Sequence, residues 1–110
     1  VAAQVAARRP GLLGVDAALE RVEEGRDRSP LDPALRDLHV RLLADRALRS
    51  ERPEDLEAAR REAEAATRAD PANPSHHRHL ADVLAAGGDR ERAARERARA
   101  RELEPEGEAR

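Results

Sequence analysis

The chain has 110 residues, 39% of them hydrophobic, and its 21 basic and 23 acidic side chains leave a formal net charge of −2. This length suits one domain, or a fragment of a longer array, but not two independent cores. The balanced charge argues against a disordered chain, and the lack of Cys excludes disulfides, thiolate metal sites and cysteine nucleophiles.

The hydrophobic residues are small: 24 Ala, 13 Leu and six Val, with no Ile, Met or aromatic residue. Ala, Leu, Glu and Arg are strong helix formers, and the alternating runs typical of strands are missing. We therefore predict an all-α fold with a small aliphatic core. The predicted helices span 1–9, 12–24, 33–49, 54–69, 74–86 and 89–104, which makes about three helical hairpins.

The first part, 1–25, has the length of a helical pair that turns around Pro10. Gly25 is expected to end its second helix, because glycine takes the left-handed conformation common at helix ends. The polar stretch 26–32 is then a linker and the boundary between subdomains. We interpret 1–25 as a divergent hairpin or a cap.

The middle part, 33–73, begins at Pro33, where Asp32 can cap the free amides of the helix. Its first helix has apolar residues on two sides, Val40, Leu43 and Leu48 among them, so we expect it to lie in the middle of a stack. Pro53 and the acidic residues after it begin the second helix, whose small side chains share one face.

The last part, 74–107, begins at Pro74, with Asn73 as the expected cap. Gly87 and Gly88 should end its first helix, and Asp89 should cap its second. From Pro33 to Pro74 the chain advances 41 residues, so the middle part should have the longer first helix.

The chain matches itself at an offset of 34 residues. The identical pairs are Asp55 and Asp89, Glu57 and Glu91, Ala59 and Ala93, Arg61 and Arg95, Glu62 and Glu96, Ala66 and Ala100, and Pro71 and Pro105. A 34-residue period of paired helices resembles the tetratricopeptide repeat (TPR). The resemblance is clearest over 74–107, where Leu80, Ala81, Leu84, Gly88, Ala93, Ala100 and Pro105 stand at motif positions. The aromatic positions of the motif hold His77, Leu84 and Arg97 instead.

The resemblance implies a solenoid whose inner groove is lined by the first helix of each hairpin and binds a peptide or helix of a partner protein. Val40 and Leu43, if exposed, would be the apolar anchors of that groove, and Asp82 would accept from a peptide amide or pair with Arg78 one turn away. The positions that the resemblance assigns to the groove are Arg36, Asp37, Val40, Leu43, Ser75, Arg78, His79 and Asp82.

Two other binding chemistries suggest themselves. His76 and His79 stand three residues apart, as metal-binding imidazoles on one helix can, but the sequence places no carboxylate beside them. We therefore predict no metal site and expect His77 to replace a packing aromatic residue.

The arginine-rich helix 89–104 suggests RNA binding, but its acidic residues nearly cancel the charge and no aromatic residue is present for base stacking.

No spacing in the sequence specifies a catalytic site, so we expect no enzyme, no cofactor and no small-molecule substrate. The leading hypothesis is a protein-binding scaffold. The alternative is a structural or self-assembling segment of a larger multi-subunit or membrane-associated protein, and RNA binding is a third.

The longest apolar runs are a few residues, so we expect no transmembrane segment and favour the cytoplasm. All the basic residues are Arg, which indicates a GC-rich bacterial genome or a designed sequence.

Overall fold

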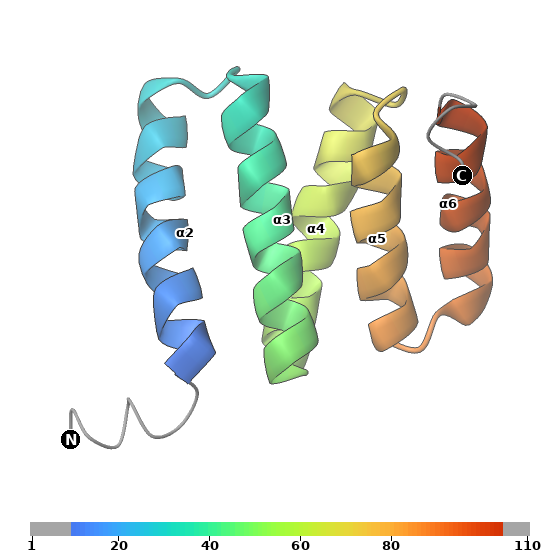
Figure 1. The fold of residues 1–110 in the computed structure, drawn as a ribbon, viewed down its shortest axis with the longest axis horizontal. Helices are drawn as coiled ribbons and strands as arrows, with labels where there is room; N and C mark the ends of the chain where they lie inside the picture. Colours follow the sequence, from blue (N-terminus) through green and yellow to red (C-terminus); the bar gives the residue numbers. More distant parts are fainter. Residues whose placement is uncertain (1–9, 105–110) are drawn as a thin grey trace.

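The computed structural model describes residues 10–104, which form five α-helices and no strand (Figure 1). The all-α prediction is confirmed for this range, and the helix predicted at 1–9 lies outside it. Consecutive helices run in opposite directions and form a row with α2 at one end and α6 at the other (Figure 1). The helices are α2 (Pro10–Arg28), α3 (Pro33–Ser50), α4 (Pro53–Ala69), α5 (Pro74–Ala86) and α6 (Arg90–Leu103).

The predicted helix starts are confirmed in their capping geometry. Asp32 and Asn73 each accept a hydrogen bond at 2.9 Å from the amide two residues further on, and Asp89 accepts one at 3.1 Å from the third amide. Pro33 and Pro74 occupy the first helical position, where a missing N–H costs nothing. Local sequence therefore decides where these helices begin.

The ends of α3 and α5 use different residues for the same backbone conformation. The helix α5 ends at Gly87 and Gly88, as predicted, and Gly88 has a φ of 97°. The helix α3 ends at Glu51, whose φ of 56° is also left-handed. A side chain in this region costs about 1–2 kcal/mol, so Glu51 holds strain that Gly88 avoids.

The prediction that Gly25 ends a helix is wrong, because α2 continues through it to Arg28. A Cβ atom on Gly25 would lie 3.3 Å from Leu35 Cδ1, so this glycine allows α2 to approach α3 closely. Only 29–32 connects the two helices, and Pro30 explains the stop, since the residue before a proline disfavours the helical conformation.

The expected linker also contains a structural arginine. Arg26 Nη1 donates to His39 Nδ1 at 2.8 Å and to Glu62 Oε2 at 2.7 Å, and so ties α2 to α3 and α4. A guanidinium that bridges two helices in this way indicates continuous packing across the predicted subdomain boundary.

The core consists of small side chains in two clusters. The first cluster contains Val15, Leu19, Leu43, Ala44, Ala47, Ala59 and Val83. The second contains Val40, Ala63, Ala66, Leu80, Ala81, Leu84 and Ala93. The helix α3 contributes to both clusters and contacts α2, α4 and α5, which confirms its predicted place in the middle of the stack. The expectation that Leu48 joins the core is wrong, since this side chain is 42% exposed.

The hairpins α3–α4 and α5–α6 lie next to each other so that α5 contacts both α3 and α4. As predicted, the first helix of the earlier hairpin is the longer one, with 18 residues in α3 against 13 in α5. Because α3 and α5 touch directly, the residues beside their contact lie on one face of the molecule.

Candidate binding surface

The face shared by α3 and α5 brings together polar residues from both helices, and we call it the α3–α5 surface. Asp37 comes from α3 and lies opposite His76 and His79 of α5. The distance from His76 Nδ1 to Asp37 Oδ1 is 3.8 Å, too long for a hydrogen bond. The sequence-based view that no carboxylate accompanies these histidines is wrong, because Asp37 reaches them from another helix.

Three buried polar atoms on this surface lack a hydrogen-bond partner among residues 10–104: Asp37 Oδ1, His76 Nδ1 and His79 Nδ1. Leaving such an atom unpaired costs about 1–3 kcal/mol, so native proteins rarely keep one without a reason. Two further unpaired atoms belong to His39 and Arg46, but each lies 3.4 Å from a carboxylate oxygen. The deficit is therefore concentrated between α3 and α5.

Burial lowers the pKa of His76 and of His79 below the ordinary value of 6.5. The attraction of Asp37 opposes the shift in both cases but does not outweigh desolvation. Both rings are therefore neutral near pH 7, and a neutral imidazole offers one donor and one acceptor. Where it is exposed, the ring of His79 can thus donate to or accept from a polypeptide backbone.

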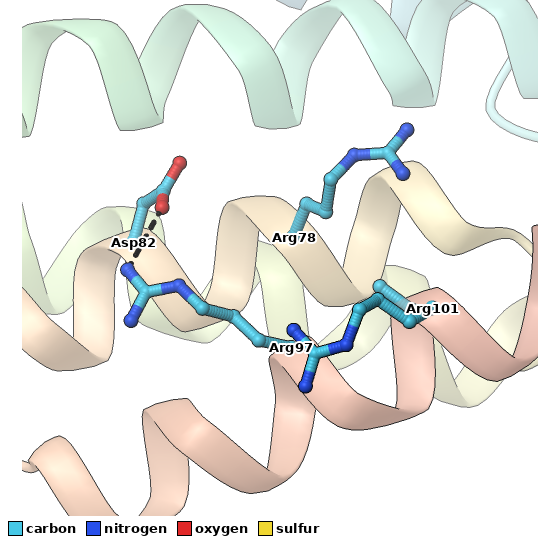
Figure 2. A pocket seen from close by; sticks show the side chains of 5 residues that line it. Arg78, Asp82, Arg97 and Arg101 are labelled. Atoms are coloured by element: carbon cyan, nitrogen blue, oxygen red, sulfur yellow. Dashed lines mark hydrogen bonds and ion pairs between the residues drawn. The ribbon is translucent and has the colours of Figure 1, made fainter. Parts of the chain in front are cut away.

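The helix α5 also forms a cleft of about 210 Å³ with α6. Arg78 and Asp82 reach into it from α5, and Arg97 and Arg101 line it from α6 (Figure 2). Asp82 Oδ1 accepts from Arg97 Nη2 at 3.2 Å, while Arg78 pairs with Glu104. The predicted pairing of Arg78 with Asp82 is wrong, because Arg78 pairs with Glu104 at the end of α6 and Asp82 pairs with Arg97 of α6.

The proposed apolar anchors of the groove are not accessible. Val40 is 0% exposed and Leu43 is 6% exposed, and both belong to the core clusters. Their assignment to a binding groove is therefore wrong, because the packing of α4 and α5 on α3 covers them. The remaining predicted groove residues keep partly or fully exposed positions: Arg36, Asp37, Ser75, Arg78, His79 and Asp82.

A larger cleft of about 590 Å³ lies where α4, α5 and α6 meet, and the sequence analysis missed it. Its floor includes Leu56 and Val83, and charged residues of α4 and α6 stand at its rim. Residues from three helices form it, so no single stretch of sequence signals it.

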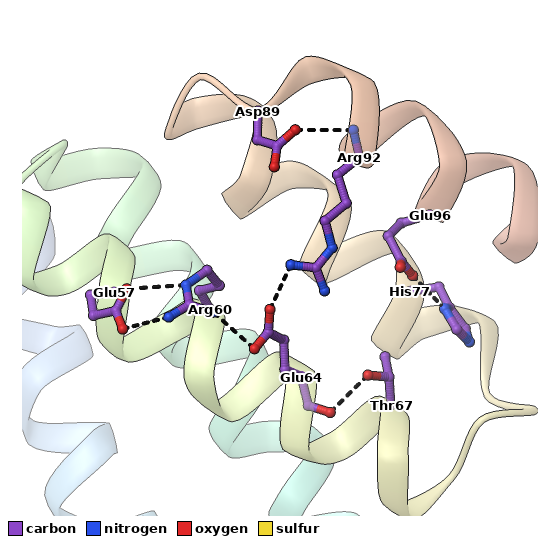
Figure 3. Close-up of polar contacts among 8 residues, drawn as sticks. All are labelled: Glu57, Arg60, Glu64, Thr67, His77, Asp89, Arg92 and Glu96. Carbon is purple, nitrogen blue, oxygen red and sulfur yellow. Dashed lines mark hydrogen bonds and ion pairs between the residues drawn. The ribbon is translucent and has the colours of Figure 1, made fainter.

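Ion pairs join α4 to α6 beside this larger cleft, whose lining includes Arg60 and Arg92 (Figure 3). Glu64 accepts from Arg60 of its own helix and from Arg92 of α6, both at 2.8 Å. Burial alone would raise the pKa of Glu64, but the hydrogen bonds from Arg92 and Arg60 together lower it. Glu64 therefore stays ionised and joins the two hairpins.

Among the described residues, no group of three or more His, Cys, Asp or Glu side chains is arranged to hold a metal ion. His77 is buried and has polar contacts at both ring nitrogens. Its Nδ1 lies 2.7 Å from Glu96 Oε1 and its Nε2 lies 2.8 Å from the Pro71 carbonyl oxygen. It thus links α5, α6 and the loop before α5.

The arginines of α6 are mostly paired with carboxylates. The pairs are Arg92 with Glu64, Arg95 with Glu91, Arg97 with Asp82, and Arg99 with Glu102. Paired guanidinium groups neutralise fewer phosphates, so the geometry argues against the RNA-binding hypothesis.

No family model matches the sequence, and no match is found among curated proteins or solved structures. No helix within 10–104 combines the length and the apolar character needed to cross a membrane. Function is therefore inferred from the surface chemistry of the helices.

Proposed function

We propose that the chain is a non-catalytic, TPR-like scaffold that binds a peptide or helix of a partner protein on its α3–α5 surface. The internal repeat supports this proposal, because Ala59 and Ala66 in α4 are buried like their counterparts Ala93 and Ala100 in α6. The direct contact between α3 and α5 also supports it, since a solenoid groove is formed by the first helices of adjacent hairpins.

The observation that carries the proposal is the contact between α3 and α5, which places Asp37, with a side chain 41% exposed, opposite the partly exposed His79. A polypeptide bound there can donate a backbone N–H to the exposed part of the Asp37 carboxylate, and a neutral imidazole such as that of His79 can meet either an N–H or a carbonyl where the ring is exposed.

The surrounding residues favour an extended or helical polypeptide. Arg36 and Ser75 stand near the same end of the two helices as Asp37 and His76, and Asp82 continues the row along α5. Mixed charge of this kind provides orientation rather than bulk attraction. No apolar pocket accompanies it, so we expect moderate affinity that depends on backbone hydrogen bonds.

A displayed library of random peptides, selected on the immobilised chain at high salt, tests the proposal. Selected peptides should lose about tenfold or more in affinity for Asp37→Ala and for His79→Ala, since hydrogen bonds to charged or buried groups are worth about 1.5–3 kcal/mol. Affinity is measured by fluorescence polarisation after circular dichroism has shown that each variant is folded.

The matched controls are Arg61→Ala and Arg68→Ala, which truncate exposed residues of α4. Both should bind the selected peptides as the unmodified chain does. The proposal fails if no peptide is enriched, or if peptides bind the Asp37 and His79 variants as tightly as the controls.

A further inference from the structure

The cleft of about 590 Å³ where α4, α5 and α6 meet takes no part in the proposed function. The apolar side chains of its lining are Pro53 and Leu56 of α4 and Val83, Leu84 and Ala86 of α5. Pockets that bind organic groups enclose about 300–1,000 Å³ and combine a mostly apolar lining with a few polar groups. The cleft therefore has the size and the lining of a binding site.

A second junction of three helices, at the same end of the row, shows why this cleft stays open. There α2 begins, α3 ends and α4 begins (Figure 1). Arg46 of α3 bridges that junction, because its Nη1 donates to Asp16 of α2 at 3.3 Å and its Nε lies 3.4 Å from Asp55 Oδ1 of α4. The α5 residues that line the cleft are no longer than leucine, so none of them can bridge it in this way.

The charged residues at the rim of the cleft balance one another. Arg60 and Arg92 line it together with the acidic Glu57 and Asp89. Each of the two guanidinium groups also donates to Glu64 at 2.8 Å (Figure 3). The rim therefore carries no excess of charge that would attract an ion, and an uncharged group suits the lining better.

The guanidinium of Arg60 already uses all three of its nitrogens as donors. Its Nε and Nη2 donate to the two carboxylate oxygens of Glu57, at 3.0 and 2.5 Å, and its Nη1 donates to Glu64 (Figure 3). The side chain is nevertheless 34% exposed. Because a guanidinium donates within its plane, these bonds leave its flat faces for other contacts, and an aromatic ring is the group that stacks on such a face.

The chain itself cannot provide that ring, since it contains no Phe, Tyr or Trp. Neither a second copy nor another segment of the same chain is therefore the occupant. Aromatic side chains are enriched in the cores of protein interfaces, where they fill recesses of the partner and contribute much of the binding energy. The chemistry of the cleft thus points to a different protein.

We propose that the cleft between α4, α5 and α6 receives an aromatic side chain of a partner protein. The ring packs on the apolar lining around Leu56 and Val83, and one of its faces stacks on the guanidinium of Arg60. The cleft uses the last turn of α5, whereas His76 and His79 of the α3–α5 surface stand in its first two turns. The proposal does not depend on peptide binding at the α3–α5 surface.

Two short peptides test the proposal: an acetylated and amidated pentapeptide of Gly and Ala with a central Trp, and its analogue with Leu at the centre. Because the chain has no aromatic residue, ring-current shifts of its methyl resonances in a carbon–proton NMR spectrum come from the peptide alone. The Trp peptide should shift the methyl groups of Val83 and Leu84 in a saturable way and bind at least about fivefold more tightly than the Leu peptide. The methyl groups of Leu31, which is 82% exposed and does not line the cleft, should show no saturable shift.

Two substitutions locate the contact. Arg60→Gln removes the cation, so the Trp peptide should bind this variant only about as tightly as the Leu peptide does. Leu56→Gln makes the floor of the cleft polar and should weaken both peptides. The matched controls are Arg95→Gln and Leu48→Gln, which make the same changes at exposed residues outside the cleft and should leave both affinities unchanged. Circular dichroism checks that each variant is folded.

Saturable shifts confined to the cleft, together with the loss of the preference for Trp in the Arg60 variant, would support the proposal. Absence of saturable binding by the Trp peptide overturns it, and so does equal affinity for the two peptides. A preference for Trp that persists in the folded Arg60 variant also contradicts it. Tighter binding of free N-acetyl-tryptophanamide than of the Trp peptide would mean that the cleft takes small molecules instead of a partner's side chain.

Discussion

The helices α4 and α6 carry the same alanine pattern 34 residues apart, yet one is an interior helix and the other an end. Ala59 and Ala66 are buried in α4, as are Ala93 and Ala100 in α6. Between them, Ala63 is fully buried and its counterpart Arg97 is exposed. Two alanines pack each helix against its partner, and the position between them is buried only in α4, where α5 covers it.

The largest expected effect comes from exchanging these two residues. Ala63→Arg should destabilise the fold by more than about 4 kcal/mol, because it places an unpaired charge in the core between α4 and α5. Arg97→Ala should change the free energy of unfolding by about 0.5 kcal/mol or less, since it removes only an exposed ion pair. Urea titration followed by circular dichroism measures both. Similar effects at the two positions would refute the distinction between an interior helix and an end.

A second comparison sets a core leucine against a surface leucine. Leu80 is 1% exposed, so Leu80→Ala should cost about 2–5 kcal/mol through lost burial and the cavity left behind. Leu48 is 42% exposed, and Leu48→Ala should cost less than about 1 kcal/mol. Thermal unfolding of the two variants at equal concentration checks the difference. Equal losses would mean that Leu48 is covered in solution.

The two helix ends with left-handed residues provide a third comparison. Glu51→Gly should stabilise the chain by about 0.5–1 kcal/mol, because relief of the side-chain strain exceeds the extra entropy of glycine in the unfolded state. Gly88→Ala should destabilise it by about 1 kcal/mol for the reverse reason. Both residues are exposed, so packing changes should contribute little. Urea midpoints with the same sign for both substitutions would contradict this explanation.

The smallest expected effect is on the pH dependence of stability. It compares the histidines of the α3–α5 surface with Glu64 and its ion-pair partners. Burial lowers the pKa of His76 and His79, so the unfolded chain binds their protons more readily than the folded one. Their contribution to stability is therefore complete above about pH 6.5 and is lost as the pH falls below it.

The double substitution His76→Asn with His79→Asn should flatten this dependence between about pH 7 and pH 5. Carboxylates such as Glu64, whose pKa is lowered, stabilise the fold throughout this pH range. Their contribution to stability is lost only at lower pH, so they should not cause the slope between about pH 7 and pH 5. Urea unfolding across this pH range compares the variant with the unmodified chain, and an unchanged slope would exclude the two histidines as its cause.

Sequence periodicity and capping residues predicted the α-helical class, the starts of α3, α5 and α6, and the buried alanines of α4. Such features depend on neighbours along the chain, so one sequence is enough to find them. Gly25 was misread for the same reason: a glycine near a predicted helix end resembles a cap, and only the nearness of Leu35 shows that it serves close packing.

The candidate binding site was predicted only in part. The resemblance to the TPR family pointed to Asp37, His79 and Asp82, but it could not tell that Val40 and Leu43 are covered. Exposure depends on which helix lies opposite, and so does the partner of each charge, as the pairing of Asp82 with Arg97 shows.

By itself the sequence determined the helices of this protein, their order and the small side chains on which they approach each other. Helix formation, capping and spacing are local, and they are settled within one or two turns of the chain. The tertiary structure alone decided that Asp37 meets His76 and that Arg26 of α2 reaches His39 of α3 and Glu62 of α4. Those relations join residues far apart in sequence, which only the packing of the helices brings into register.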